Sequence, residues 1–525
     1  MDQLDANDVL GLTKPAKFDP PKIVFSAKEV DLVHWKGDVL AVGVTEKDMA
    51  KDKHSKFENS ILRKLDAHLE CLLAEASAEE DFTGKAGQSI VLRLPGIGSK
   101  RIALIGLGRN GSVNAYQSLG DAVAAVAKSA QAIKVAVALA SADCLSADVK
   151  LTAASAIASG ILLGIFEDNR FKSEPKKTLL QSLDIIGLGN GPDVEKKLKY
   201  AGDISSGVIY GRVLVNAPAN VLTPVILAKE ASIIASTYSD VLTAKILDAK
   251  QCKELKMGSF LGVGAASAHS SYFIHLCYKP PSGPIKAKLG LVGKTITFDS
   301  GGYNLKVGAG SRIELMKNDM GGAAAILGAA KALGEIKPLG VHFIAPACEN
   351  MISGTGMRPG DIITASDGKT IEVNNTDAEG RLALADALLY TCNLGVEKPS
   401  LNRFVHAGFC LSYILFLMPS GVFTPSEELA KEVFEASEAS GEKLWRLPLE
   451  DSYWESMKSG IADMINTGER DGGAITAALF LKQFVSEKVQ WLHMDIAGPV
   501  WNNKKSVATG FGVSTLVEWV LKNAS

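Results

Sequence analysis

Four acidic side chains in the second half of this 525-residue sequence stand beside glycine turns and apolar runs. Asp299 follows the run LGLVGKTITF and opens a Ser-Gly-Gly turn, and Asp319 precedes an alanine-rich stretch. Asp377 and Glu379 belong to the octapeptide NTDAEGRL at 375–382. Convergent carboxylates repel one another, whereas hard divalent cations favour oxygen ligands, and four carboxylates formally neutralise two such ions. The pattern therefore predicts a two-metal hydrolytic site.

Three cationic side chains accompany these acids. Lys294 lies inside the apolar run, and Lys306 follows the glycine turn. Arg381 stands two residues after the second acid of the octapeptide, so an extended chain would place it on the same side as both acids. We expect two carboxylates and a guanidinium to converge there.

The elements expected around these residues would bring them together. Residues 289–298 and 341–347 read as strands, and 321–333 and 381–392 read as helices. In open α/β sheets, ligands bind outside the carboxyl ends of the strands. A single Asp before a helix is more often only a helix cap. A solvated, ion-paired face is the other alternative, but it does not explain why every acid lies beside glycine turns and apolar strands.

The length of the chain favours two domains of unequal size. From residue 38 to about 180, short apolar runs alternate with helical stretches, which is the rhythm of a parallel sheet covered by helices. A polar, lysine-rich stretch with Pro175 indicates a boundary between about 172 and 200. We expect an α/β fold in two domains. The N-terminal domain, 1–190, has a mostly parallel sheet and an oligomerisation or regulatory role, and the larger C-terminal α/β domain, 191–525, carries the metal site.

The N-terminal part also contains GLGRNG at 106–111, directly after the expected strand RIALI. Its spacing is that of a dinucleotide-binding turn, which also needs an acid about 20 residues further on. The first acid after a plausible strand is Asp143, which is too far along. A nucleotide-dependent oxidoreductase is therefore disfavoured, and we interpret the glycines as serving a turn.

Charge and composition exclude several classes of partner. A formal net charge of -2 provides no long-range positive field for nucleic acid or an anionic membrane. We see no apolar run near the ~20 residues of a membrane helix. The seven cysteines are scattered singly, which indicates neither a disulfide framework nor a thiolate zinc site. The N-terminal sequence has no apolar core of a secretory signal. We expect a cytoplasmic protein, although a plastid precursor whose leader is missing would look the same.

The motifs VGKTITFDSGG, NDMGG and NTDAEGRL resemble those of the leucyl aminopeptidase (cytosol aminopeptidase) family, most closely its plant members. The flanking sequences PACENMISG, LWRLPLEDSYWESMKSG and GGAITAALFLKQF are also similar, so the resemblance covers nearly the whole chain. It implies a C-terminal metallopeptidase domain, a homohexamer, and release of leucine and other apolar residues from the N-termini of peptides.

The resemblance also implies a ligand set for two divalent ions, which could be Zn²⁺, Mn²⁺ or Mg²⁺. Asp299 and Glu379 would bridge both ions, Lys294 and Asp319 would complete the tighter site, and Asp377 would complete the more exchangeable one. Lys294 can bind a metal only as a neutral amine, and two adjacent cations would depress its pKa accordingly. The nucleophile would be a hydroxide formed from a bridging water.

Three further roles follow from the resemblance. Lys306 would stabilise the oxyanion of the tetrahedral intermediate, and Arg381 would hold a bicarbonate ion that shuttles the proton. Met316 would form a wall of the pocket for the first side chain, although a core methionine is about as compatible with the sequence.

One segment departs from the family pattern. The family has a strand, an acid and an Ala-Thr-Leu-Thr-Gly-Ala turn after residues 396–398, whereas this chain reads PSLNRFVHAGFCLSYILFLMPSG at 399–421. We interpret the apolar part, 409–418, as an improvised buried segment or an aggregation hazard, and altered splicing as its origin, which transcript sequencing would test. The metal ligands lie outside the segment. A second reading is therefore a catalytically impaired member that acts as a hexamer subunit or a chaperone-like protein.

Overall fold

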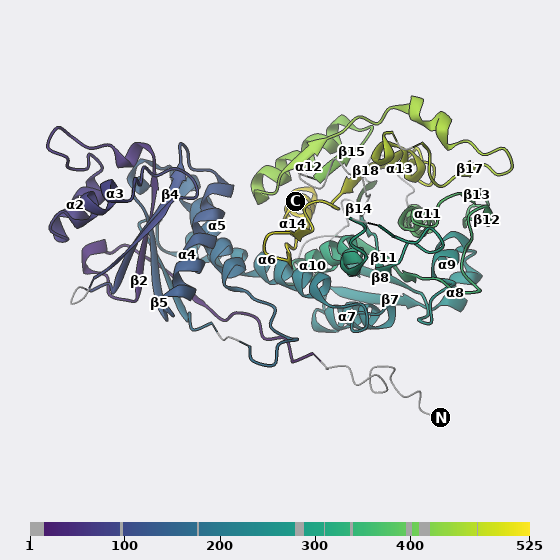
Figure 1. Cartoon of the computed structure of the whole chain (residues 1–525), viewed down its shortest axis with the longest axis horizontal. Helices are drawn as coiled ribbons and strands as arrows, with labels where there is room; N and C mark the ends of the chain where they lie inside the picture. Colours follow the sequence, from purple (N-terminus) through teal and green to yellow (C-terminus); the bar gives the residue numbers. More distant parts are fainter. Residues whose placement is uncertain are drawn as a thin grey trace. The chain divides into compact units, whose positions relative to one another are not determined.

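The computed structural model describes residues 15–94, 98–175, 178–278, 288–308, 310–336, 340–394, 402–408, 420–469 and 471–524 (Figure 1). The chain forms two compact units, which divide at Ser205 and Ser206. Helix α6 (Pro192–Asn216) contains this division. The domain boundary predicted at 190/191 falls just before that helix, and we keep it as a proposal for where the N-terminal fold ends.

The N-terminal unit is built on a six-stranded sheet in the order β1-β6-β5-β2-β4-β3. All pairings are parallel except that of β3 with β4. The elements are β1 (Val24–Lys28), β2 (Val39–Thr45), α2 (Ser60–His68), α3 (Leu72–Glu79), β3 (Ser89–Arg93), β4 (Arg101–Gly108), α4 (Val113–Ser129), β5 (Lys134–Leu139), α5 (Ala147–Ile165) and β6 (Ser182–Ile186). The expected mostly parallel α/β fold is confirmed.

Both faces of this sheet are buried, which explains its nearly continuous apolar strands. Along β2, Val39 and Ala41 pack with α4 and α5, whereas Leu40 and Val42 pack with α2 and α3. Helix α5 is long and apolar enough to cross a membrane by length and composition alone, which the sequence reading overlooked. Half of it is buried, and Gly160 lies so close to α4 that a Cβ there would stand 2.2 Å from the Gln117 carbonyl oxygen. Its packing is that of a core helix.

The second unit contains a nine-stranded sheet in the order β16-β15-β18-β14-β9-β11-β8-β7, with β10 paired to β11. Its strands are β7 (Leu242–Leu247), β8 (Tyr272–Tyr278), β9 (Lys288–Gly293), β10 (Ile296–Asp299), β11 (Val341–Asn350), β14 (Asn402–Gly408), β15 (Ser420–Phe423), β16 (Leu444–Arg446) and β18 (Gln490–Asp495). Two small sheets accompany it: β12 (Asp361–Thr364), β13 (Thr370–Val373) and β17 (Met464–Ile465) in one, and β19 (Trp501–Asn502) and β20 (Val507–Ala508) in the other.

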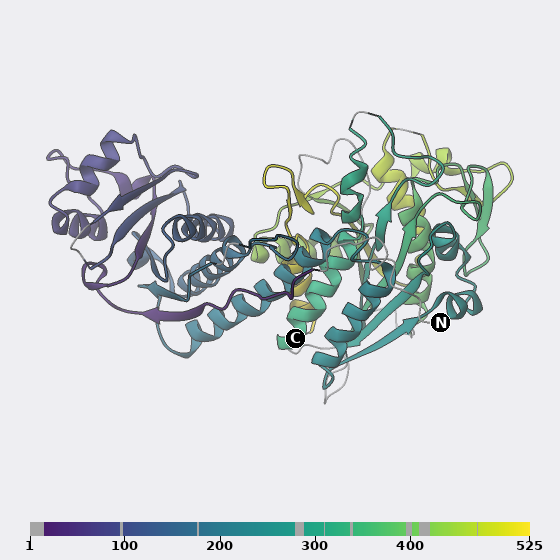
Figure 2. The ribbon, with the colours of Figure 1, turned by 60° about the horizontal axis from the view of Figure 1, so that its bottom comes forward.

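Helices cover both faces of the large sheet (Figures 1 and 2). Phe273, Val292 and Ile344 share a core with α9, α11 and α13, whereas the alternate residues Leu291 and Phe343 are buried on the side of α7 and α10. The helices are α7 (Pro224–Thr237), α8 (Ala249–Glu254), α9 (Gly258–Gly264), α10 (Gly321–Ile336), α11 (Glu379–Cys392), α12 (Glu427–Ser440), α13 (Gly473–Lys482) and α14 (Val513–Ala524).

The segment at 399–421 is described only in part. Its residues 402–408 form β14, which pairs in parallel with β9 on one side and β18 on the other, so the chain keeps a strand in the middle of the sheet. Residues 420–423 form β15. The expected Ala-Thr-Leu-Thr-Gly-Ala position and the apolar part at 409–418 lie outside the described residues.

Candidate metal centre

The carboxyl ends of parallel strands position the first half of the site. Lys294 follows β9 directly, and Asp299 is the last residue of β10. Both strands run parallel to β11, so their ends meet at one edge of the sheet. The turn after β10 is tight: Gly301 has φ +89°, and its amide donates to Asp299 Oδ1 at 2.9 Å. The same oxygen accepts from Asn350 Nδ2 at 2.8 Å, at the end of β11.

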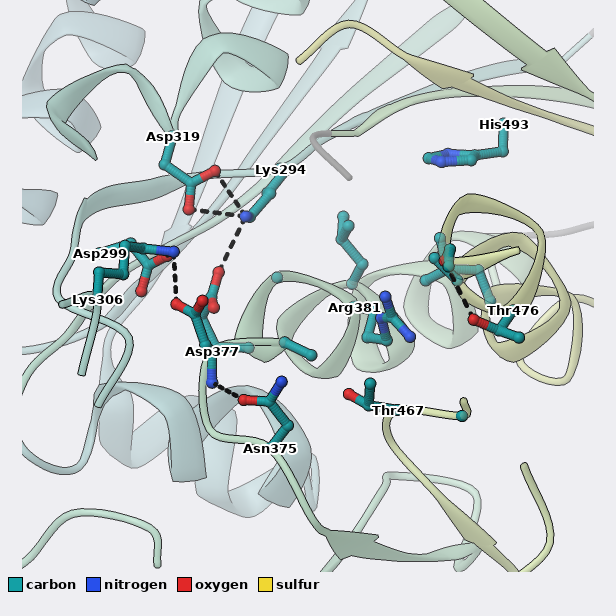
Figure 3. A pocket seen from close by; sticks show the side chains of 18 of the residues that line it. Lys294, Asp299, Lys306, Asp319, Asn375, Asp377, Arg381, Thr467, Thr476 and His493 are labelled. Atoms are coloured by element: carbon teal, nitrogen blue, oxygen red, sulfur yellow. Dashed lines mark hydrogen bonds and ion pairs between the residues drawn. The ribbon is translucent and has the colours of Figure 1, made fainter. Parts of the chain in front are cut away.

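The other acids come from the starts of two helices. Asp319 ends the short 3-10 helix η4 (Ile313–Asn318), two residues before α10, and Glu379 is the first residue of α11. The octapeptide is a turn followed by the start of that helix and is not extended, in contrast to the premise of the sequence reasoning. Asp377 and Arg381 nevertheless line the same cavity as Glu379 (Figure 3), because the turn and the helix start both face it.

Glycine in the octapeptide makes room for the lysine. A Cβ on Gly380 would stand 2.1 Å from Lys294 Cε, so any larger residue would collide with that side chain. Thr376 joins the octapeptide to the β10 turn, since its hydroxyl donates to the Gly301 carbonyl oxygen at 2.7 Å. Asn375 accepts from the Asp377 amide at 2.9 Å and fixes the turn.

Two buried lysines lie among the acids (Figure 3). Lys294 Nζ is 2.6 Å from Asp319 Oδ1 and 2.9 Å from Glu379 Oε1. Lys306 Nζ is 2.8 Å from Asp299 Oδ2 and 2.5 Å from Asp377 Oδ1. All predicted metal ligands and Lys306 therefore form one cluster.

The cluster carries more negative than positive charge. Four carboxylates (-4) and two ammonium groups (+2) leave a formal charge of -2. Burial, the charge of Asp299 and then the other acids raise the pKa of Asp377 to about 7 despite the contact with Lys306. Burial also raises the pKa of Asp319 well above its usual value, in spite of Lys294. These carboxyls thus resist ionisation unless further positive charge is supplied.

The lysines respond in the opposite direction. Burial alone would lower the pKa of Lys294, but the charges of Asp319, Glu379 and Asp299 raise it above its usual value. The same balance, led by the charge of Asp299, raises the pKa of Lys306. Ammonium groups thus occupy places where the acids require cations.

The donor set fits divalent metal ions. Carboxylate oxygens of Asp299, Asp319 and Glu379 lie within 4.8 Å of one another, and all three residues are buried. Both carboxylate oxygens of Glu379 are buried and accept no hydrogen bond from the described part of the chain, and Oε1 has the ion pair with Lys294. Buried carboxylates are normally paired or bound to a metal, because leaving them unsatisfied costs free energy. Oxygen-rich sites of this kind suit hard or borderline divalent cations.

The cluster opens into a cavity of about 330 Å³. Arg381 lies on the side of the cavity toward Thr467 and Thr476, and its Nη1 donates to the Asn466 carbonyl oxygen at 2.8 Å (Figure 3). His493, from β18, also lines the cavity, and burial followed by the charge of Arg381 lowers its pKa to about 3. The imidazole is therefore neutral at physiological pH. The apolar lining comprises Leu384, Ala477 and Leu481.

Sequence reasoning missed several members of this site. Asn350 could have been found by the same strand-end argument as Asp299, since it ends β11. The walls formed by 467–469 and α13 carry no such signal, although GGAITAALFLKQF was noted as similar to the family. Met316 is buried in η4 and is not one of the described residues that line the cavity. Its role in the pocket stays a prediction.

In this α/β protein of two units, the strand ends bring buried carboxylates together beside an open cavity. This arrangement is typical of metal-dependent hydrolases. Residues 209–517 match the model of the cytosol aminopeptidase family catalytic domain, and residues 41–175 match that of its N-terminal domain. The chain belongs to the cytosol aminopeptidase family and is a leucine aminopeptidase, a metal-dependent exopeptidase.

Individual relatives agree over nearly the whole length. The chain is 69% identical to neutral leucine aminopeptidase, chloroplastic, of Solanum lycopersicum, over 99% of this chain and 91% of the relative. It is 67% identical to leucine aminopeptidase 1 of Arabidopsis thaliana, over 98% and 99% respectively. A solved structure of a tomato leucine aminopeptidase mutant superimposes with a TM-score of 0.92 at 62% identity, covering 98% of this chain and 99% of that one.

The expectation of a cytoplasmic protein was wrong. Relatives at 64–69% identity from tomato, rice, potato and Arabidopsis thaliana are named chloroplastic.

Proposed function

We propose that the buried carboxylate cluster holds two divalent ions, with Asp299 and Glu379 bridging both. Lys294 and Asp319 complete the tighter site, and Asp377 completes the more exchangeable one. The buried oxygens of Glu379 carry this assignment, because they accept no hydrogen bond from the described residues. They lie within 4.8 Å of oxygens of Asp299 and Asp319, and among the described residues only the ammonium of Lys294 forms an ion pair with them. Lys294 would hold an ion only as a neutral amine, with its proton released to solvent as the ion supplies the positive charge. Zn²⁺, Mn²⁺ and Mg²⁺ all suit these donors.

When bound, the two ions polarise the scissile carbonyl and lower the pKa of water so that hydroxide is available near neutral pH. The protein side chains provide the rest. Lys306 stays protonated, because the charges of four acids raise its pKa, and it stabilises the negative charge that develops on the carbonyl oxygen. Buried charges of this kind act strongly because water does not screen them.

Arg381 is proposed to hold a bicarbonate ion that accepts and returns the proton. Its guanidinium reaches the cavity from the first turn of α11, where helix N–H groups also favour an anion. The neighbouring His493 is neutral and buried, so Arg381 provides the positive charge on this side of the cavity. A planar guanidinium matches the geometry of a planar oxyanion.

The cavity is proposed to select peptides with a free N-terminus and an apolar first residue. The amine of the substrate can bind an open coordination position in its neutral form, which a blocked terminus cannot do. Leu384, Ala477 and Leu481 provide an apolar surface for the first side chain. The catalytic unit is proposed to work within a homohexamer, and the chain within the chloroplast, as its relatives are named.

Substrate selection tests this proposal directly. With Mn²⁺ present, kcat/KM is measured for leucyl, glutamyl and N-acetyl-leucyl chromogenic amides. We expect the leucyl amide to be hydrolysed fastest and the acetylated amide to resist hydrolysis. Equal rates for the free and acetylated amides would contradict recognition of the amine, and light scattering under the same conditions tests the hexamer.

A further inference from the structure

Two histidines and a cysteine gather on the large sheet, away from the carboxylate cluster. His275 and Cys277 belong to β8, and His342 is the second residue of β11. The two strands pair antiparallel, with His342 directly opposite Cys277 and Ile344 opposite His275. Side chains alternate along a strand, so all three point to the same face of the sheet. That face is the one covered by α11, since Tyr390 of α11 contacts His275.

The three side chains are close enough to share one ion. Their candidate ligand atoms all lie within 4.8 Å of one another. His275 Nε2 is 2.9 Å from His342 Nδ1, so the two imidazoles share one hydrogen. Ligand atoms around a tetrahedral Zn²⁺ stand about 3.3–3.7 Å apart for bond lengths of about 2.0–2.3 Å. Shifts of less than about 1 Å would bring the cluster to that geometry.

A second contact orients the central histidine. The Tyr390 hydroxyl lies 3.1 Å from His275 Nδ1, and its ring packs edge-on against Phe273 at 4.9 Å between centroids. When Nδ1–H donates to this hydroxyl, the lone pair of Nε2 points at His342. Metal-binding histidines typically have such a partner on the other ring nitrogen, which fixes the tautomer and the ring.

The cluster is accessible and separate from the catalytic centre. His275 is 7% exposed, whereas Cys277 and His342 are partly exposed, so an ion can enter from solvent. Tyr390 follows Glu379 by eleven residues on the same helix, which corresponds to about 16 Å at the rise of an α-helix. The donors also differ, because imidazole and thiolate favour Zn²⁺ over Mg²⁺ or Mn²⁺.

We propose that His275 Nε2, His342 Nδ1 and Cys277 Sγ bind one Zn²⁺ ion per chain, with water in the fourth position. The ion would take the place of the hydrogen shared by the imidazoles, His342 would keep its proton on Nε2 as the other neutral tautomer, and the thiol proton would be released to solvent. It would connect β8 to β11 beneath the end of α11. Because the unfolded chain offers no such arrangement, binding would stabilise the fold.

Co²⁺ substitution tests the site through sulfur coordination. The full-length protein is saturated with Mn²⁺ and titrated with Co²⁺ while thiolate-to-cobalt charge-transfer absorption is recorded. The proposed catalytic ligands contain no sulfur, so a band reports a cysteine. We expect a band that saturates at one Co²⁺ per chain, disappears on addition of Zn²⁺, and is absent from Cys277→Ser. His342→Asn should weaken Co²⁺ binding by at least about 10- to 100-fold.

Matched variants separate this site from other cysteines and histidines. Cys71→Ser and His54→Asn change exposed residues of the N-terminal unit and should leave the band intact. Zinc analysis provides a readout that does not need Co²⁺: the wild-type protein should hold one more Zn²⁺ than Cys277→Ser or His342→Asn, while leucine release persists in both. Absence of the band from the wild-type protein, or its survival in Cys277→Ser, would overturn the proposal.

Discussion

The two units of this chain use the same kind of strand end in different ways. Strand β4 of the N-terminal unit ends at Gly108, inside the glycine-rich segment 106–111, and a Cβ on Gly106 within the strand would stand 2.1 Å from the Lys85 carbonyl oxygen. These glycines allow the backbone to pack closely. At the end of β10, a Cβ on Gly301 would stand 2.5 Å from the Asn304 carbonyl oxygen and 2.8 Å from an Asp377 oxygen, so this glycine lets the backbone turn and also makes room for a charged side chain. A strand end becomes a site only through the side chains that converge on it.

Buried acids differ between the units in the same way. Asp184 of β6 accepts hydrogen bonds from Ser26 at 2.5 Å, Trp35 Nε1 at 2.7 Å and Lys28 at 2.9 Å. These donors outweigh burial and lower its pKa. Glu379 of the second unit accepts no hydrogen bond within the described structure, and its only ion-pair partner there is the ammonium of Lys294, which Asp319 shares. A buried acid with several hydrogen-bond donors stabilises the fold, whereas a buried cluster of acids with too few donors is a place for a cation.

The largest expected effect is on Asp299, which we propose bridges both ions. Asp299→Asn removes one negative charge at the centre of the cluster while keeping its size. We expect leucine release to fall to background and metal content at the centre to drop, as measured with a chromogenic leucyl amide and by metal analysis. Asp184→Asn is the control, since it changes a satisfied buried acid and should keep both. Wild-type turnover by Asp299→Asn would contradict the difference that we draw between the buried acids of the two units.

Lys306→Ala separates oxyanion stabilisation from metal binding within the cluster. Loss of one oxyanion donor typically lowers kcat by about 100- to 1,000-fold, and we expect a loss of that size with metal content retained. The measurement is kcat at saturating leucyl amide and Mn²⁺. Lys253→Ala, at an exposed position of α8, should match the wild-type rate. A Lys306→Ala rate close to wild type would assign oxyanion stabilisation to other groups.

How much of this could be read from the sequence depends on how local each signal is. Asp299 and Glu379 were predicted because each stands at the end of an apolar run or the start of a helix, whereas the ligand role of Lys294 followed from the family resemblance. Leu481 and His493 of the cavity wall were not predicted, because about one hundred residues separate them from the octapeptide. Only the folding of the chain brings them near it. The His275, Cys277 and His342 cluster depends on strand register, which scattered single residues do not reveal.

Asp184→Asn tests the satisfied acid and its pH dependence. We expect a loss of about 1–3 kcal/mol in the free energy of unfolding of the N-terminal unit at neutral pH. Because the folded pKa of Asp184 lies below that of the unfolded chain, its contribution is fully present above about pH 4. It is lost as the pH falls through the folded pKa.

Hydrogen exchange of β1 and β6 measures this effect without interference from the catalytic unit. The difference between wild type and Asp184→Asn should be constant from about pH 7 to about pH 4 and shrink below that. A difference that instead grows as the pH falls would contradict the sign of the shift.

The smallest effect is expected at the N-terminal glycine turn. Gly108 has φ +81° with no atom closer than 3.5 Å to an added Cβ, so Gly108→Ala should cost about 1–2 kcal/mol of stability through backbone strain alone. Thermal unfolding measures this cost. Leucine release should stay unchanged, because the turn has no part in the chemistry. Reduced turnover with unchanged stability would give the turn a function that we do not assign to it.

The most direct measurement is leucine release by the purified full-length chain before chelation, after chelation, and after Mn²⁺ is restored. We predict hydrolysis of a leucyl amide that disappears with the metals and returns with them. Hydrolysis that survives chelation would contradict a metal-dependent centre. A metal-loaded chain that releases no leucine would contradict the proposed activity of the centre, and would favour the second reading of a catalytically impaired member with an altered segment at 399–421.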